Sequence, residues 1–107
     1  MIAFELHWSF QSRKSLRDIR KYYSEVANIR ISNKLVQDII SSAEILKDSQ
    51  YIGQKEILLE NRKSEYRYLV YINYKIIYSV DVSQKKILIH EVFDCRQNPL
   101  KLENISE

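Results

Sequence analysis

The chain has 107 residues, of which 45% are hydrophobic and 29% charged, a composition that excludes disordered and membrane-spanning proteins. Its 17 Lys and Arg against 14 Asp and Glu give a net charge of +3, which permits an acidic partner without requiring one. Cys95 is the single cysteine and no apolar run reaches the ~18 residues of a membrane span, so we expect one cytoplasmic domain over residues 1–107, without disulfides or membrane contact.

The first half of the chain predicts a short strand followed by two helices. Apolar residues alternate with polar or small ones over residues 2–7, which is the pattern of a strand with one buried face. Ser9 is a suitable N-cap, and apolar residues at helical spacing predict an amphipathic helix over roughly residues 10–27. Ser32 offers a second N-cap for a helix that ends near Lys47. Two helices with a short link are expected to lie antiparallel as a hairpin.

The second half predicts a sheet. Residues 48–65 have poor periodicity, with a short extended piece expected at residues 57–59 and a polar turn after it. Tyrosines and β-branched residues then mark three strands, with Asn73 suited to the first turn; the strands are 66–72, 74–80 and 86–93. Pro99 ends this pattern, and we expect residues 99–107 to form a tail or a short terminal turn. We therefore predict an α+β fold in which an N-terminal strand and helix hairpin pack on a C-terminal antiparallel β-meander.

Few residues suit metal or nucleophilic chemistry. His7, His90 and Cys95 have no paired ligand spacing, so neither a metal site nor a cofactor is expected. Cys95 lies five positions from His90, which places the two on opposite faces of a regular strand. For Cys95 a buried, small apolar residue is therefore the favoured interpretation over a nucleophile.

Two further groups of charged residues remain open in function. Carboxylate pairs suited to acid–base work are present, but the sequence does not show that they converge. These pairs are Glu91 with Asp94 and Glu56 with Glu60. A basic stripe with i, i+4, i+7 spacing is more typical of a solvated helix face than of a nucleic-acid contact. The stripe consists of Arg13, Arg17 and Arg20.

The order of these segments resembles a known family. A strand ending in Trp8-Ser9 and a helix pair precede Y-R-Y-L-V at residues 66–70, N-Y-K-I-I-Y at 73–78 and V-F-D-C-R-Q-N-P at 92–99. On these segments the chain resembles the RelE/ParE toxins of bacterial type II toxin–antitoxin systems, from about residue 4 to residue 102.

The resemblance implies a growth-inhibiting toxin, associated with plasmid stabilisation, that a cognate antitoxin neutralises by wrapping over its surface. It leaves two targets. The ParE branch binds and inhibits DNA gyrase, whereas the RelE branch is a metal-independent endoribonuclease that cleaves mRNA in the ribosomal A site.

The RelE branch uses basic residues and a tyrosine, of which two positions are basic here. A RelE-branch arginine corresponds to Lys75, which keeps the charge but loses the planar fork that grips a phosphate, and the arginine after the last strand corresponds to Arg96. Both would be catalytic in a RelE-like enzyme. The structural alternatives are a strand lysine that opposes edge pairing and an arginine paired with Asp94 or with the chain terminus.

The remaining RelE-branch positions are not matched. The lysine pair falls on Tyr66 and Tyr68, with Arg67 one residue out of register, and the catalytic tyrosine falls near Leu102. Removing one charge-stabilising donor costs on the order of 100–1,000-fold in rate, so the missing groups favour a ParE-like inhibitor. Five residues are the expected contacts with target or antitoxin: Arg13, Arg17, Arg20, Arg67 and Tyr74. Three tyrosines remain as substitutes for the missing catalytic one: Tyr71, Tyr74 and Tyr78.

Overall fold

A computed structural model describes residues 3–96 and residue 105 of the chain. In chain order the elements are β1 (Glu5–Trp8), α1 (Phe10–Val26), α2 (Ile29–Ser42), the 3-10 helix η1 (Glu44–Lys47), β2 (Gln54–Lys55), the 3-10 helix η2 (Ile57–Leu59), β3 (Arg67–Tyr71), β4 (Tyr74–Asp81) and β5 (Lys86–Asp94). None of the described helices is long and apolar enough to cross a bilayer.

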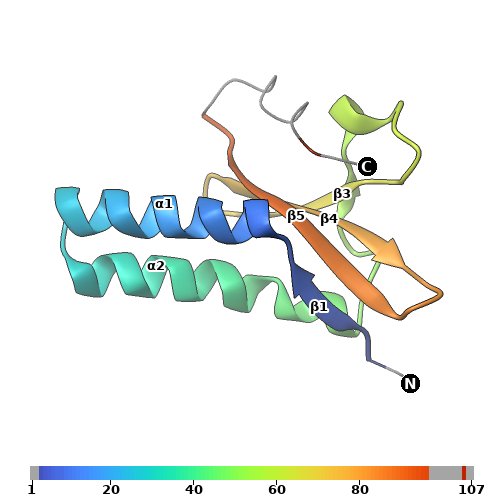
Figure 1. The fold of residues 1–107 in the computed structure, drawn as a ribbon, viewed down its shortest axis with the longest axis horizontal. Helices are drawn as coiled ribbons and strands as arrows, with labels where there is room; N and C mark the ends of the chain where they lie inside the picture. Colours follow the sequence, from blue (N-terminus) through green and yellow to red (C-terminus); the bar gives the residue numbers. More distant parts are fainter. Residues whose placement is uncertain (1–2, 97–104, 106–107) are drawn as a thin grey trace.

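The two helices form the predicted hairpin, and its end extends beyond the sheet (Figure 1). Ser9 caps α1 as predicted, accepting a hydrogen bond from the Ser12 backbone at 2.9 Å. The predicted start of the second helix is wrong, because Asn28 caps α2 by accepting from the Ile31 backbone at 2.9 Å. Ser32 is instead buried inside the helix, where its hydroxyl donates to the Arg20 carbonyl at 2.5 Å and joins α2 to α1.

The sheet has five strands in the order β1-β5-β4-β3-β2. The predicted antiparallel meander is confirmed as β3, β4 and β5, with Asn73 in the turn between the first two. Strand β1 lies beside β5 and runs parallel to it, since the helix hairpin carries the chain back across the sheet before the meander begins. The α+β fold class is confirmed.

The segment before the meander differs from the prediction. Residues 57–59 form a 3-10 turn rather than an extended piece, because the Glu56 carboxylate accepts from the Leu58 backbone at 3.2 Å. The short strand β2 pairs with β3 and was not predicted. The expected tail at residues 99–107 lies outside the described residues apart from Ile105, which is buried.

A β-bulge interrupts β5. Ile77 of β4 pairs with Glu91, whereas the next residue, Tyr78, pairs with Ile89, so His90 is an extra residue in β5. The side chains of His90 and Cys95 therefore cannot be assigned to opposite faces of the sheet by simple alternation along the strand. Cys95 is also exposed, so the interpretation as a buried apolar residue is wrong.

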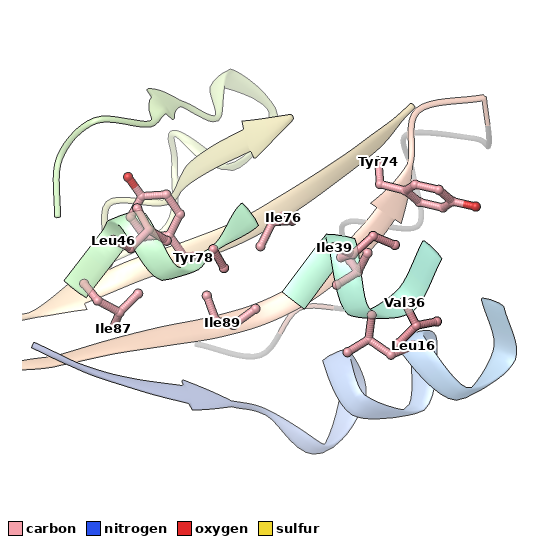
Figure 2. Packing of buried hydrophobic residues seen from close by; sticks show 11 residues of the cluster. Leu16, Val36, Ile39, Leu46, Tyr74, Ile76, Tyr78, Ile87 and Ile89 are labelled. Carbon is pink, nitrogen blue, oxygen red and sulfur yellow. The ribbon is translucent and has the colours of Figure 1, made fainter. Parts of the chain in front are cut away.

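The core lies between the helix hairpin and one face of the sheet (Figure 2). Leu16 of α1 and Val36 of α2 pack with Ile76 and Tyr78 of β4 and Ile89 of β5. A second, smaller cluster involves the opposite face of the sheet, where alternation places Ile77. Its members are Leu59, Tyr66, Ile77, Phe93 and Ile105. Side chains of β4 thus alternate between a helix-covered face and a face with its own small core.

Candidate functional site

A cleft of about 510 Å³ lies where α1 meets the ends of β4 and β5. We call it the α1–β5 cleft. One turn after another of α1 contributes to its wall, because residues three and four apart share a helix face. The lining residues from α1 are Gln11, Ser15, Asp18, Ile19, Tyr22 and Tyr23, and those from the strands and the turn after them are Tyr74, Glu91, Val92, Phe93, Asp94 and Arg96. Its volume lies in the ordinary range of ligand-binding sites.

Arg96 is held at one end of this cleft. Its Nε and Nη2 donate to the two carboxylate oxygens of Asp94 at 3.0 and 2.8 Å, and the Asn73 amide donates to Asp94 at 3.1 Å. The hydrogen bonds from Arg96 lower the pKa of Asp94 to about 2. Tyr23 of α1 hydrogen-bonds Arg96 as well, and both partners raise the pKa of the guanidinium. The predicted structural pair of Arg96 with Asp94 is therefore present.

Tyr74 meets Arg96 in this cleft through a shared neighbour. Only 3% of Tyr74 is exposed, and it hydrogen-bonds Tyr23. Burial, followed by that hydrogen bond, raises the pKa of the Tyr74 hydroxyl. Any contact of Tyr74 with a partner is thus limited to the edge that lines the cleft.

Lys75 lies on the other face of β4. Its ammonium forms an ion pair with Glu56 at 3.0 Å and stands over the Tyr68 ring at 4.2 Å from the ring centre. Glu56 is only 4% exposed, so the lysine neutralises a buried carboxylate. Lys75 therefore does not line the α1–β5 cleft, whereas Arg96 does.

Arg67 stabilises the sheet edge next to β2. It pairs with Glu65 at 2.8 Å and donates to the Gly53 and Tyr51 carbonyls at 2.8 and 3.2 Å. Its guanidinium also lies over the Tyr51 ring, 5.2 Å from the centre. These bonds hold the loop before β2.

The basic stripe of Arg13, Arg17 and Arg20 lies exposed on α1. Arg17 is 6.0 Å from the centre of the Phe10 ring, which is itself exposed. At about 100° per residue, the stripe faces roughly away from residues 11, 15, 18 and 22 of the cleft. Of the residues singled out from the sequence, the cleft gathers Tyr74, Arg96 and the carboxylate pair Glu91 and Asp94.

Sequence reasoning missed the role of Tyr23. Tyr23 falls at helical spacing from Leu16 and Ile19, which predicts a core residue, and that spacing does not show that its hydroxyl reaches Arg96 across the cleft. Glu56 was considered with Glu60, yet its partner is Lys75. Glu91 could have been noticed from the sequence, because it interrupts an apolar run in a predicted strand, where acidic residues are uncommon.

The five-stranded mixed sheet and the helix hairpin define an α+β fold of the RelE/ParE kind. Residues 6–99 match the family described as the ParE toxin of the type II toxin–antitoxin system parDE. The chain belongs to the ParE toxin family.

Solved structures show the same fold. A chain of the chromosomal ParDE toxin–antitoxin system from P. aeruginosa superimposes with a TM-score of 0.71 at 19% identity, covering 86% of this chain and 96% of the other. A chain of the RelBE2 toxin–antitoxin complex from Mycobacterium tuberculosis superimposes with a TM-score of 0.59 at 13% identity, covering 88% and 93%. No curated protein matches in sequence.

Proposed function

We propose that this toxin arrests growth by binding DNA gyrase rather than by cleaving RNA. The observation that carries the proposal is the engagement of Lys75 by the buried Glu56, on the face of the sheet away from the α1–β5 cleft. A phosphate bound at Arg96 would gain no stabilisation from a lysine held elsewhere. Membership of the ParE family supports the same choice.

The alternative is a RelE-like, ribosome-dependent endoribonuclease that uses Lys75 and Arg96. The fold shared with the RelBE2 complex chain favours it. Its cost lies in the electrostatics, because each absent donor lowers the rate on the order of 100–1,000-fold. In addition, two N–H groups of Arg96 already donate hydrogen bonds to Asp94 and are not free to bind a phosphate.

We further propose that a cognate antitoxin neutralises the toxin in the cytoplasm, where either target would be met. The related chains come from toxin–antitoxin complexes, which supports a protein partner of this kind. The exposed stripe of Arg13, Arg17 and Arg20 offers an acidic antitoxin three charges on one face of α1.

Two assays on one preparation test the target. Purified toxin that arrests growth is added to a gyrase supercoiling reaction, and separately to a translation reaction whose mRNA is analysed by primer extension. We expect inhibited supercoiling and no cleavage in the A site. Cuts in the A site that disappear in the Arg96→Ala variant would overturn the proposal and establish the endoribonuclease.

A further inference from the structure

Among the described residues, no lysine or arginine forms an ion pair with Glu91, a carboxylate that lines the α1–β5 cleft. We propose that the cleft receives an arginine side chain of the target protein, with Glu91 as the anion that binds it. This inference rests on the proposed function, because it requires that the target be a protein. Beyond the proposed function, the inference states which chemical group of the target the toxin recognises.

Glu91 is held in place before any partner arrives. Its Oε2 accepts from the Gln11 amide at 3.1 Å, while its Oε1 accepts from the Ser15 hydroxyl and from the Val92 backbone at 2.8 Å. All three donors are neutral. A carboxylate has about four lone-pair positions, two on each oxygen, so Oε1 is fully used and Oε2 keeps one position for a further donor. A partner would find the side chain already ordered, which reduces the entropy lost on binding.

The other charges of the cleft are compensated within the toxin. Asp94 pairs with Arg96 at 2.8 Å and Asp18 pairs with Lys14 at 3.1 Å. By contrast, no lysine or arginine in residues 3–96 forms an ion pair with Glu91. Asp94 and Asp18 thus have cations on the toxin, whereas Glu91 has none among residues 3–96, in a chain whose net charge is +3. Charge complementarity selects a single cation.

The walls of the cleft favour arginine over lysine. Tyr22 is 57% exposed, and its ring is held edge-on to Tyr23 with the ring centres 5.0 Å apart. A guanidinium can stack on an aromatic face while its planar fork bonds a carboxylate, whereas an ammonium is a compact charge that stays strongly hydrated. The cleft thus offers an arginine an aromatic wall as well as a carboxylate, and a hydrated ammonium uses the aromatic wall less well.

The position of the cleft separates it from the basic stripe. Figure 1 shows the start of α1 close to β5, with the rest of the helix extending beyond the sheet. The cleft lies on the side of α1 that meets β5, while Arg13, Arg17 and Arg20 lie on the roughly opposite side. A cationic anchor suits the cleft and an acidic chain suits the stripe, so the structure assigns the cleft to the target rather than to an acidic antitoxin.

The test compares Glu91→Gln with the wild-type toxin in gyrase binding and supercoiling inhibition. Glutamine keeps the length of the side chain and an oxygen that accepts from Ser15, and loses the charge. We expect affinity and inhibition to fall tenfold or more, because truncating one partner of a desolvated charge pair has effects of that size. Glu60→Gln removes the same charge outside the cleft and should change neither. Thermal melts of both variants exclude a folding defect as the cause.

A second probe reports on the cleft without gyrase. N-acetyl-argininamide is titrated into 15N-labelled toxin, with the isosteric citrulline compound as the neutral control. We expect the Val92 amide to shift with the arginine compound in the wild type and to stay unchanged in Glu91→Gln.

The outcomes separate this inference from the proposed function. Gyrase inhibition that Glu91→Gln leaves intact would overturn the arginine site while the gyrase proposal stands. Should the wild type fail to bind gyrase, the proposed function fails instead, and the argininamide titration decides the cleft. A shift at Val92 then supports the site, and no shift overturns it.

Discussion

At the scale of single residues, the ion pair between Lys75 and Glu56 has the clearest consequence for function. The Lys75 ammonium lies over the Tyr68 ring and pairs with Glu56, so a residue that the sequence offered as catalytic also has a role in the fold. Removing the counter-ion of a buried carboxylate destabilises the protein, because the charge that remains is neither paired nor hydrated.

Replacing Lys75 with methionine should therefore destabilise the protein. We expect the free energy of unfolding to fall by about 2–3 kcal/mol, because Glu56 stays buried without its cation. Urea denaturation measures it. The matched control is Lys55→Met, which removes an exposed lysine 3.8 Å from Glu65 and should change stability by less than about 0.5 kcal/mol. Equal effects of the two changes would contradict a supporting role for Lys75.

His90 should make stability depend on pH. Its Nε2 lies 2.7 Å from the Ser79 hydroxyl, and burial lowers the pKa of the imidazole below its usual 6.5. The unfolded chain then binds the proton more readily than the folded one. Stability from this group is complete above pH 6.5 and is lost as the pH falls toward the lowered pKa.

Denaturation curves between pH 7.5 and pH 4.5 check this expectation. The loss belongs to His90 if the His90→Gln variant shows a flatter profile across that window. The pKa of Asp94, about 2, contributes separately, since its stabilisation is full above 3.8 and is lost only as the pH falls from there toward 2. A wild-type profile that stays level down to pH 4.5 would be inconsistent with the assignment.

At the scale of elements, the start of α2 is where local sequence signals competed. Both Asn28 and Ser32 are good N-cap residues, and the structure uses the first. Starting the helix earlier adds a turn to the hairpin. It also brings the Ser32 hydroxyl to the Arg20 carbonyl, and this contact between the two helices cannot be predicted from the sequence of α2 alone.

Removal of the cap should cost about 1 kcal/mol of unfolding free energy in Asn28→Ala, since one backbone N–H of the first turn then lacks its acceptor. Thermal or urea unfolding gives the value. Asn33→Ala, on the exposed face of the same helix, is the control and should be neutral or slightly stabilising because alanine has the higher helix propensity. An insensitive Asn28 variant would mean that the helix end is satisfied in another way.

At the scale of the whole molecule, the two sides of α1 have opposite electrostatic character. One side carries the arginine stripe, and the other carries Glu91 of the α1–β5 cleft, which has no ion-pair partner among residues 3–96. A small toxin can in this way present different surfaces to a neutralising partner and to a target.

Changing Arg13, Arg17 and Arg20 together to glutamine should weaken antitoxin binding about tenfold at low salt and leave growth arrest intact, since exposed charges contribute roughly 0.2–1 kcal/mol each. Calorimetry at several salt concentrations checks it. The wild-type and variant affinities should converge at high salt, where such charges are screened. Affinities that are equal at every salt concentration would remove the stripe from the antitoxin interface.

The sequence by itself determined the class of fold and the family. Helical spacing, the Ser9 cap and the tyrosine-rich alternation of the meander are local signals, and local signals predict elements well when they are long and periodic. The segments around Asn73 and Arg96 then identified the RelE/ParE resemblance, which the family match over residues 6–99 confirmed.

Tertiary structure decided which charges meet. Lys75 and Glu56 are brought together by the pairing of β3 with β2 and β4, and Tyr23 reaches Arg96 only because α1 lies across the end of β5. The bulge at His90 altered the alternation of β5 without any glycine to announce it. Ion pairs and hydrogen bonds between elements depend on packing in three dimensions, whereas periodicity reports only on neighbours along the chain. For that reason the sequence supplied the candidate residues, and the structure showed which of them share a site.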